Sequence, residues 1–244
     1  MTQSTLQHLA LLLPEAAFVP EHSAVSALGF LAAAAGALGA LLAATASLAA
    51  RRRTWAAGIG LASVAGAVAY GAVLFGCSLA SRDRVLAAGG RKYFCELDCH
   101  LAYSVAGVER ARTVGLPAAA VAARGRFTII RVRTWFDPST IAPFRGNAPL
   151  TPNPRDAWLV DASGRRIFPS AAATRAFEEA AGSFSPFSRP LSPGQSYETA
   201  LVFDLPTDAR GLRLFVGDPP GVERLIIGHE NSPGHGKTWF AIPA

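Results

Sequence analysis

The sequence predicts a pair of membrane-spanning helices followed by an all-β antiparallel sandwich. Two uncharged stretches rich in alanine and glycine, separated by three arginines, fill most of the first third of the 244-residue chain. After residue 92, short runs of β-branched and aromatic residues alternate with turns rich in proline, glycine, asparagine and aspartate. The first pattern is typical of a transmembrane hairpin and the second of a sandwich.

The overall composition is apolar for a soluble protein and moderately basic. Hydrophobic residues make up 50% of the chain, the mean hydropathy is +0.27 and the formal net charge is +6. Apart from Arg51, Arg52 and Arg53, the basic residues are scattered and do not alternate with aromatic residues, so we expect no nucleic-acid partner. Three cysteines are too few for a disulfide scaffold.

Residues 1–23 are expected to form a short N-terminal segment. They contain no Lys or Arg, which argues against a cleaved signal peptide. Their apolar run at 9–13 is too short to span a bilayer and is expected to lie at its interface. The hairpin follows over residues 24–81, with helices at about 24–50 and 54–81, each longer than the roughly 20 residues that a ~30 Å hydrocarbon core requires.

Small residues recur at a spacing of four in both predicted helices. Gly36 with Ala40, and Gly58 with Ala62, are expected to let two helices approach closely, either within the hairpin or against another membrane protein. The alternative interpretation of the two apolar runs is a pair of buried helices in a soluble protein.

The basic loop predicts the orientation of the hairpin. The positive-inside rule places Arg51, Arg52 and Arg53 in the cytoplasm, with Trp55 at the adjacent interface. The C-terminal domain would then lie on the extracytoplasmic side of a bacterial inner (cytoplasmic) membrane. A second group of basic residues beyond the hairpin opposes this assignment: Arg82, Arg84, Arg91 and Lys92.

The predicted β-sandwich covers residues 92–244 and follows a polar linker at 82–91. About seven short strands with turn signals between them indicate an antiparallel sandwich, and about 150 residues suffice for one core. Residues 170–179 are expected to form one or two helical turns. The expected strands are 93–108, 127–136, 157–161, 166–168, 197–205, 212–216, 225–227 and 238–242.

Three motifs in the C-terminal half carry a resemblance to a known class of domain. They are LSPGQS at residues 191–196, ALVFDLP at 200–206 and GLRL at 211–214, and AWLVDASGRRIF at 157–168 adds a hairpin. Together they resemble membrane-anchored, telokin-like domains of the immunoglobulin type in bacteria. The resemblance implies an immunoglobulin-like sandwich and membrane anchoring, and it covers about half the chain.

The stretch YFCELDCHLAYSV at residues 93–105 is the candidate for chemistry. Cys95, Cys99 and His100 lie within six residues, and His229 and His235 form a second group near the C-terminus. Thiolate and imidazole ligands suit copper or zinc, so these five residues are a candidate metal site. The Cys-x3-Cys spacing partly resembles the dinuclear copper loop of cytochrome oxidase subunit II, although residues 101–104 lack the further His and Met of that loop.

Four other interpretations of the same stretch stay open. Cys-x3-Cys-His is one residue longer than a haem attachment motif, a disulfide would need a bend in the strand, and a redox thiol pair normally has two intervening residues. In the simplest interpretation the stretch is one half-buried strand, because apolar and polar residues alternate along it. Cys95 and Cys99 are then small core residues, and Glu96, Asp98 and His100 are solvated.

The sequence contains no hydrolase or nucleotide-binding motif, so we expect a protein that is not an enzyme. The main hypothesis is a membrane-anchored envelope protein whose sandwich acts as a binding or scaffold module, or as an accessory subunit of a membrane complex. Its partners would be the lipid bilayer and other membrane proteins. The alternative is an envelope metal-binding or electron-transfer protein that uses Cys95, Cys99, His100, His229 and His235.

Overall fold

The two uncharged stretches form two long helices, α2 (Ser23–Ala49) and α3 (Arg53–Ala80), in the computed structural model. The structure describes residues 15–96, 98–182 and 184–243, so the apolar run at 9–13 lies outside the described residues. The chain divides into two compact units. The helical unit contains Val19–Arg82 and Pro220–Gly236, and the β-domain contains residues 15–18, Asp83–Pro219 and the chain from Lys237 onward.

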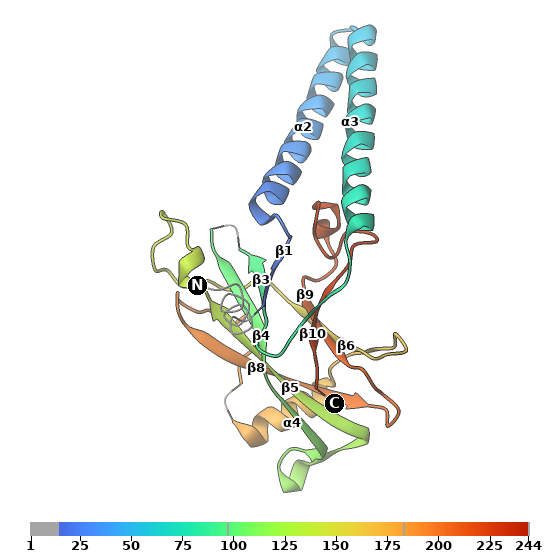
Figure 1. Cartoon of the computed structure of the whole chain (residues 1–244). Coiled ribbons are helices and arrows are strands. Elements are labelled where there is room, and N and C mark those ends of the chain that lie inside the picture. Colours follow the sequence, from blue (N-terminus) through green and yellow to red (C-terminus); the bar gives the residue numbers. More distant parts are fainter. Residues whose placement is uncertain (1–14, 97, 183, 244) are drawn as a thin grey trace, which may run out of the picture. The chain divides into compact units, whose positions relative to one another are not determined.

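In the helical unit, α2 and α3 lie side by side and are joined by a tight turn (Figure 1). The turn is short because Arg51 adopts a left-handed conformation, with φ of 57°, between the two helix ends. Both helices are long and apolar enough to cross a membrane. The prediction of two long apolar helices ahead of a β-rich domain is therefore confirmed.

The small residues of the two helices do not bring α2 and α3 together as expected. A Cβ atom added to Gly36 or Gly58 would meet no heavy atom within 4 Å, so these glycines face away from the neighbouring helix. The expected close approach at these positions is therefore wrong for α2 against α3, and an approach by another membrane protein stays a prediction. Periodicity places small residues on one face of a helix but does not decide which face the partner helix covers.

The described β-domain is built from two sheets of five strands each. In order across the sheet, sheet A contains β1 (Ala16–Val19), β3 (Arg91–Cys95), β4 (His100–Val114), β5 (Val121–Phe136) and β8 (Ser196–Leu205). Sheet B contains β2 (Arg84–Leu86), β10 (Thr238–Ala241), β9 (Arg213–Gly217), β6 (Asp156–Val160) and β7 (Arg166–Ile167). Short 3₁₀ turns occur at Pro117–Ala119, Pro138–Thr140 and Val222–Leu225.

Sheet B is mixed rather than purely antiparallel. Strand β10 pairs parallel with β2 and antiparallel with β9. The parallel pair forms because the two strands begin beside each other, where the Lys237 N–H donates to the Asp83 carboxylate at 2.9 Å. The segment at 82–91, expected as a linker, therefore contains a strand, and the expectation of a purely antiparallel sandwich is wrong at this edge.

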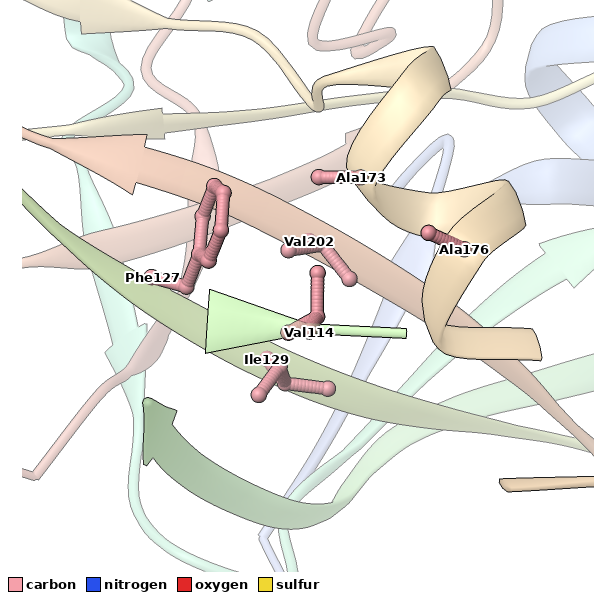
Figure 2. Close-up of a cluster of buried hydrophobic side chains, with 6 residues drawn as sticks. All are labelled: Val114, Phe127, Ile129, Ala173, Ala176 and Val202. Atoms are coloured by element: carbon pink, nitrogen blue, oxygen red, sulfur yellow. The ribbon is translucent and has the colours of Figure 1, made fainter. Parts of the chain in front are cut away.

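Helix α4 (Ala171–Ala181) covers one face of sheet A. Ser170 begins the helix, and its side chain accepts a hydrogen bond from the Ala173 N–H at 3.3 Å. Figure 2 shows the contact, in which small helix residues pack on strand residues of β4, β5 and β8. The buried cluster consists of Val114, Phe127, Ile129, Ala173, Ala176 and Val202.

This cover explains why burial does not alternate along β5 between Phe127 and Ile130. Phe127 and Ile129 pack under α4, while Thr128 and Ile130 point to the opposite face and are also buried. Beyond the helix the first face becomes solvated. There Arg131 and Arg133 form ion pairs with Glu198 at 3.5 and 3.0 Å.

Candidate functional site

The stretch predicted as one continuous strand is a β-hairpin. Strand β3 ends at Cys95 and β4 begins at His100, and these two residues are cross-strand partners. The turn between them closes through a hydrogen bond from the Glu96 N–H to the Cys99 carbonyl at 2.9 Å. The prediction of one strand is wrong because the alternation of apolar and polar residues continues through the turn by chance.

The chemistry of the hairpin favours thiols over metal-binding thiolates. All three cysteines of the chain are present as thiols. Burial, together with the neighbouring Asp98 carboxylate, raises the pKa of the Cys99 thiol to about 12. A thiolate is the form that ligates a metal or attacks a disulfide, so Cys99 is held in its inactive form. Burial also lowers the pKa of His100.

The predicted second group of ligands belongs to the other unit of the chain. His229 and His235 lie in Pro220–Gly236, which is part of the helical unit. His229 is buried and its Nδ1 accepts a hydrogen bond from the Asn231 N–H at 3.0 Å. Among the residues that the structure describes, no group of three His, Cys, Asp or Glu side chains is arranged to hold a metal ion. The predicted copper or zinc site is not supported.

The acidic residues of the hairpin are paired with arginines rather than solvated. Arg155 lies between Glu96 and Asp218 and donates to both carboxylates, to Glu96 at 2.5 Å. Only 1% of the Arg155 side chain and 3% of the Glu96 side chain are exposed. The guanidinium also stacks 4.2 Å above the Phe94 ring. The expectation of a solvated Glu96 is therefore wrong, and the group is an ion-pair network inside the β-domain.

Asp98 makes a second such pair. The Arg145 Nη1 lies 2.7 and 2.8 Å from the two carboxylate oxygens of Asp98. The Ala142 N–H also donates to the Asp98 carbonyl at 2.7 Å. These bonds hold the Pro-rich loop that follows β5 onto the hairpin turn. The hairpin thus has a structural role, because the carboxylates of Glu96 and Asp98 are paired with arginines of the β-domain.

Glu96 makes the stability of the β-domain depend on pH. Burial raises the pKa of Glu96 to about 7 from its ordinary 4.5, although Arg155 acts to lower it. Between these two values the folded chain keeps a proton that the unfolded chain releases. Raising the pH through this window should therefore lower the free energy of unfolding.

The variant Glu96→Gln removes this titration and is expected to lose less stability than the wild type between about pH 5 and about pH 7.5. Urea unfolding at both pH values, followed by tryptophan fluorescence, measures the difference. Equal pH slopes for the two proteins would show that Glu96 does not titrate in this window.

Lys92, expected only as one of the basic residues beyond the hairpin, is a further buried charge. Its side chain is fully buried, and its ammonium group donates to the Val216 carbonyl at 2.5 Å and the Thr238 carbonyl at 3.2 Å. The charge also lies 4.4 Å from the Phe215 ring. Because Lys92 belongs to sheet A and its partners to sheet B, it links the two sheets. Its role is structural.

A pocket of about 630 Å³ in the β-domain is the better candidate for binding. It lies where β4, β5 and β8 meet the turn that follows β8 and the end of β10. Every charged lining residue among those described is an arginine: Arg110, Arg112, Arg126 and Arg210. The volume is in the range of pockets that hold small ligands. Four arginines in one pocket repel one another, so an anion stabilises the arrangement.

The backbone of sheet A is irregular beside this pocket. The register of β4 against β5 shifts between Ala111 and Thr113, so that Arg112 is skipped and residues 123–126 bulge from β5. A bulge turns a side chain away from its regular direction and is common beside functional sites. The side chains of Arg112 and Arg126 make no hydrogen bond or ion pair within the described residues, whereas Arg110 and Arg210 donate to backbone carbonyls, so the guanidinium groups of Arg112 and Arg126 are available to a ligand.

The bulge is fixed by one carboxylate and one close approach of backbone. Asp204 accepts from the N–H groups of Arg124 and Gly125 at 3.1 and 3.2 Å. A Cβ atom on Gly125 would lie 2.1 Å from the Leu205 carbonyl oxygen, so only glycine fits there. The pocket wall is thus held by specific contacts and is formed before any ligand arrives.

Thr128 supplies a buried polar group in the same pocket. It pairs across the strands with Arg110, lies two residues from Arg126 and is fully buried. Its hydroxyl has no hydrogen-bond partner among the described residues. A buried hydroxyl without a partner costs about 1–3 kcal/mol, and a ligand oxygen in the pocket would remove that cost.

Sequence reasoning missed this site. Its arginines are spread over about 100 positions, and only the strand register brings them together. The one local signal was the alternation of Arg110 with Arg112, which puts both on one face of a strand.

Comparisons with known proteins leave the family open. No protein-family model matches the chain, and no curated protein matches it. A conserved hypothetical protein from Bacillus anthracis of known structure is similar, with 14% identity and a TM-score of 0.40 over 51% of this chain and 86% of that one. The secreted protein MPT63 from Mycobacterium tuberculosis is similar at 10% identity and a TM-score of 0.38, over 57% of this chain and 100% of that one.

Proposed function

We propose that this protein is a non-enzymatic, membrane-anchored module of the bacterial cell envelope whose β-domain binds an acidic ligand. The helices α2 and α3 cross the inner membrane as a hairpin. The β-domain, an immunoglobulin-like sandwich, faces the extracytoplasmic side and presents the arginine pocket. The acidic ligand that this pocket binds is part of a partner molecule in the envelope, so the protein works as a binding or accessory subunit.

One observation carries the anchoring part of the proposal. In their most apolar stretches, 0% of α2 and 6% of α3 are buried inside the chain. A core helix of a soluble protein would be mostly buried, and a signal sequence would account only for the helix nearer the N-terminus. With 27 and 28 residues, the helices are about 40 Å long and exceed a ~30 Å hydrocarbon core. Surrounding lipid accounts for the low burial and for the length of both helices.

The turn between the helices supports the proposed orientation. It carries Arg51 and Arg52, α3 begins at Arg53, and Trp55 follows with 67% of its surface exposed. Arginines on the cytoplasmic side and a tryptophan at the interface are the usual arrangement in membrane proteins.

The chemistry of the pocket indicates the class of ligand. Arginine guanidinium groups bind phosphate and carboxylate oxygens in pairs of parallel hydrogen bonds, and each such charged hydrogen bond contributes about 1.5–3 kcal/mol. Arg112 and Arg126 are available to provide them. The Thr128 hydroxyl can donate to the same anion. We therefore expect a ligand with at least two anionic oxygens.

Binding of two small anions tests this proposal. Isothermal titration calorimetry of the detergent-purified full chain with pyrophosphate and with citrate separates phosphate from carboxylate recognition. We expect saturable binding of at least one anion. The variant Arg112→Ala with Arg126→Ala should weaken that binding by roughly 10- to 100-fold, as expected for lost charged hydrogen bonds.

Arg175→Ala is the matched control, because Arg175 is an exposed arginine on α4 outside the pocket. It should bind as the wild type does. If neither anion binds, or if the double variant binds as tightly as the wild type, the pocket is not the ligand site.

A further inference from the structure

The segment Pro220–Gly236 connects β9 to β10 but forms a compact unit with the two helices. In Figure 1 it is the red stretch beside the end of α3. Hydrogen bonds tie it to α3 and to the residues that flank the two helices. The Tyr70 hydroxyl donates to the Leu225 carbonyl at 2.5 Å, the Glu21 N–H donates to the Gly228 carbonyl at 3.3 Å, and the Gly236 N–H donates to the Ser81 hydroxyl at 2.7 Å.

These bonds set the depth of the segment along α3. Gly236 is level with Ser81, which follows the last residue of the helix. The Leu225 carbonyl lies within reach of the side chain of Tyr70, which is ten residues before Ala80 and therefore about 15 Å further along the helix axis. The tip of the segment thus extends from the end of α3 toward the level of Tyr70, while Gly228 lies beside Glu21, just ahead of α2.

That depth coincides with the expected membrane boundary. A ~30 Å hydrocarbon core takes about 20 residues of a helix. Counted from Arg53 at the other boundary, the core ends close to Leu74. Tyr70 and the Leu225 carbonyl then lie just inside the boundary, a level at which tyrosine is often found.

Four apolar side chains at the tip of the segment are exposed or partly exposed, on either side of the charged Glu223 and Arg224. Val222 and Leu225 are 56% and 51% exposed, and Ile226 and Ile227 are partly exposed. The polar residues that follow point inward instead, since His229, Glu230 and Ser232 are buried. A loop in water would show the reverse arrangement.

Backbone groups of Leu225 and Ile226, at the tip, have hydrogen-bond partners within the chain. The Leu225 carbonyl accepts from Tyr70, the Ile226 carbonyl accepts from the Ser232 hydroxyl at 2.8 Å, and the Ile226 N–H donates to the Glu223 carbonyl at 3.0 Å. Internal satisfaction of backbone groups is what a segment needs at the edge of the hydrocarbon, where an unpaired group costs several kcal/mol.

We propose that this segment is a second membrane contact, which inserts Val222 and Leu225 into the lipid at the boundary nearest the end of α3. The partner is the bilayer itself, and the segment lies in its interface as a monotopic anchor does. The exposed Arg224 extends toward the headgroups. This inference rests on the proposed membrane anchoring by α2 and α3. In this proposal the predicted ligands His229 and His235 have a structural role, since they lie in the part of the segment that follows its apolar tip.

Spin labels at three positions test this inference and its premise separately. The full chain, with Cys77→Ala and Cys95→Ala as background, receives one new cysteine at Leu225, at Leu61 in the middle of α3, or at Ala172 on the exposed side of α4. Cys99 is 1% exposed, and the background protein must take up no label. In vesicles of phosphatidylcholine and phosphatidylglycerol, electron paramagnetic resonance measures collisions with oxygen and with a water-soluble nickel chelate.

We expect the oxygen-to-nickel collision ratio at Leu225→Cys to be several-fold above that at Ala172→Cys and below that at Leu61→Cys, because Leu225 would lie at the boundary and Leu61 in the middle of the bilayer. A label at Leu225 that is as open to nickel as the one at Ala172, while Leu61 is protected, overturns the second contact and leaves the anchoring intact. A label at Leu61 that is open to nickel overturns both. All three positions are exposed, so the labels should not disturb folding.

Discussion

The variant Arg155→Ala is expected to lower the free energy of unfolding of the β-domain by about 3–5 kcal/mol, because it leaves two buried carboxylates without their shared partner. Arg155 pairs with Glu96 and Asp218, whose side chains are only 3% and 18% exposed. The variant also removes the contact of the guanidinium with the Phe94 ring. A loss of this size is a large part of the stability of a typical domain.

Urea unfolding of the purified full chain at about pH 7, followed by tryptophan fluorescence, measures this loss. Arg84→Ala is the control, because Arg84 forms an exposed ion pair with Glu15 at 3.0 Å and should cost no more than about 1 kcal/mol. Adding Glu96→Gln and Asp218→Asn to Arg155→Ala should restore part of the stability. If Arg155→Ala costs no more than Arg84→Ala, the network does not stabilise the fold.

The second large effect is expected from a charge in the middle of α3. Val64 is 61% exposed on this helix, so the proposed anchoring places it against lipid. An arginine at the centre of a membrane helix costs about 2.5–3.5 kcal/mol, which shifts the ratio of inserted to uninserted chain by roughly a hundredfold. Val64→Arg should therefore leave much of the protein extractable from membranes by alkaline carbonate.

Val64→Leu is the matched control and should stay in the membrane fraction, since it replaces one apolar side chain by another. Quantitative immunoblotting of the pellet and supernatant gives the two fractions. If Val64→Arg is retained in the membrane as fully as Val64→Leu, then α3 does not rely on lipid around this residue.

The helices were predictable because their signal is local. A run of more than 20 residues without charge is visible in composition alone, and Arg51, Arg52 and Arg53 mark the turn. The face on which Gly36 and Gly58 lie was not predictable, because it depends on how α2 crosses α3. Composition therefore defined the elements but not their contacts.

The β-rich domain was also predictable, but its details depend on residues distant in sequence. The sequence predicts a linker where the structure has strand β2, because the partner strand β10 lies about 150 residues away and cannot be inferred from local residues. The turn at Glu96–Cys99 was missed since it contains neither glycine nor proline, and its alternation continues from one strand into the next. Glu96 is buried only because Arg155, 59 residues later, reaches it.

The arginine pocket and the segment Pro220–Gly236 show the same limit for function. Arg112 is directed by a break in strand register, and Arg126 reaches the same pocket from the next strand. In the sequence, the apolar tip with Val222 and Leu225 cannot be told from an ordinary loop. Only the hydrogen bond from the Tyr70 hydroxyl to the Leu225 carbonyl places it beside α3. In each case a pair of contacts between distant residues creates the candidate site.

Membrane flotation of the full chain is the most direct test of the account. Membranes from expressing cells are washed with alkaline carbonate and centrifuged through a density gradient, with and without detergent. We expect the protein to float with the lipid after the carbonate wash and to be released only by detergent. Protein that stays at the bottom of the gradient without detergent would show that α2 and α3 are covered by something other than lipid, and would contradict the proposed anchoring.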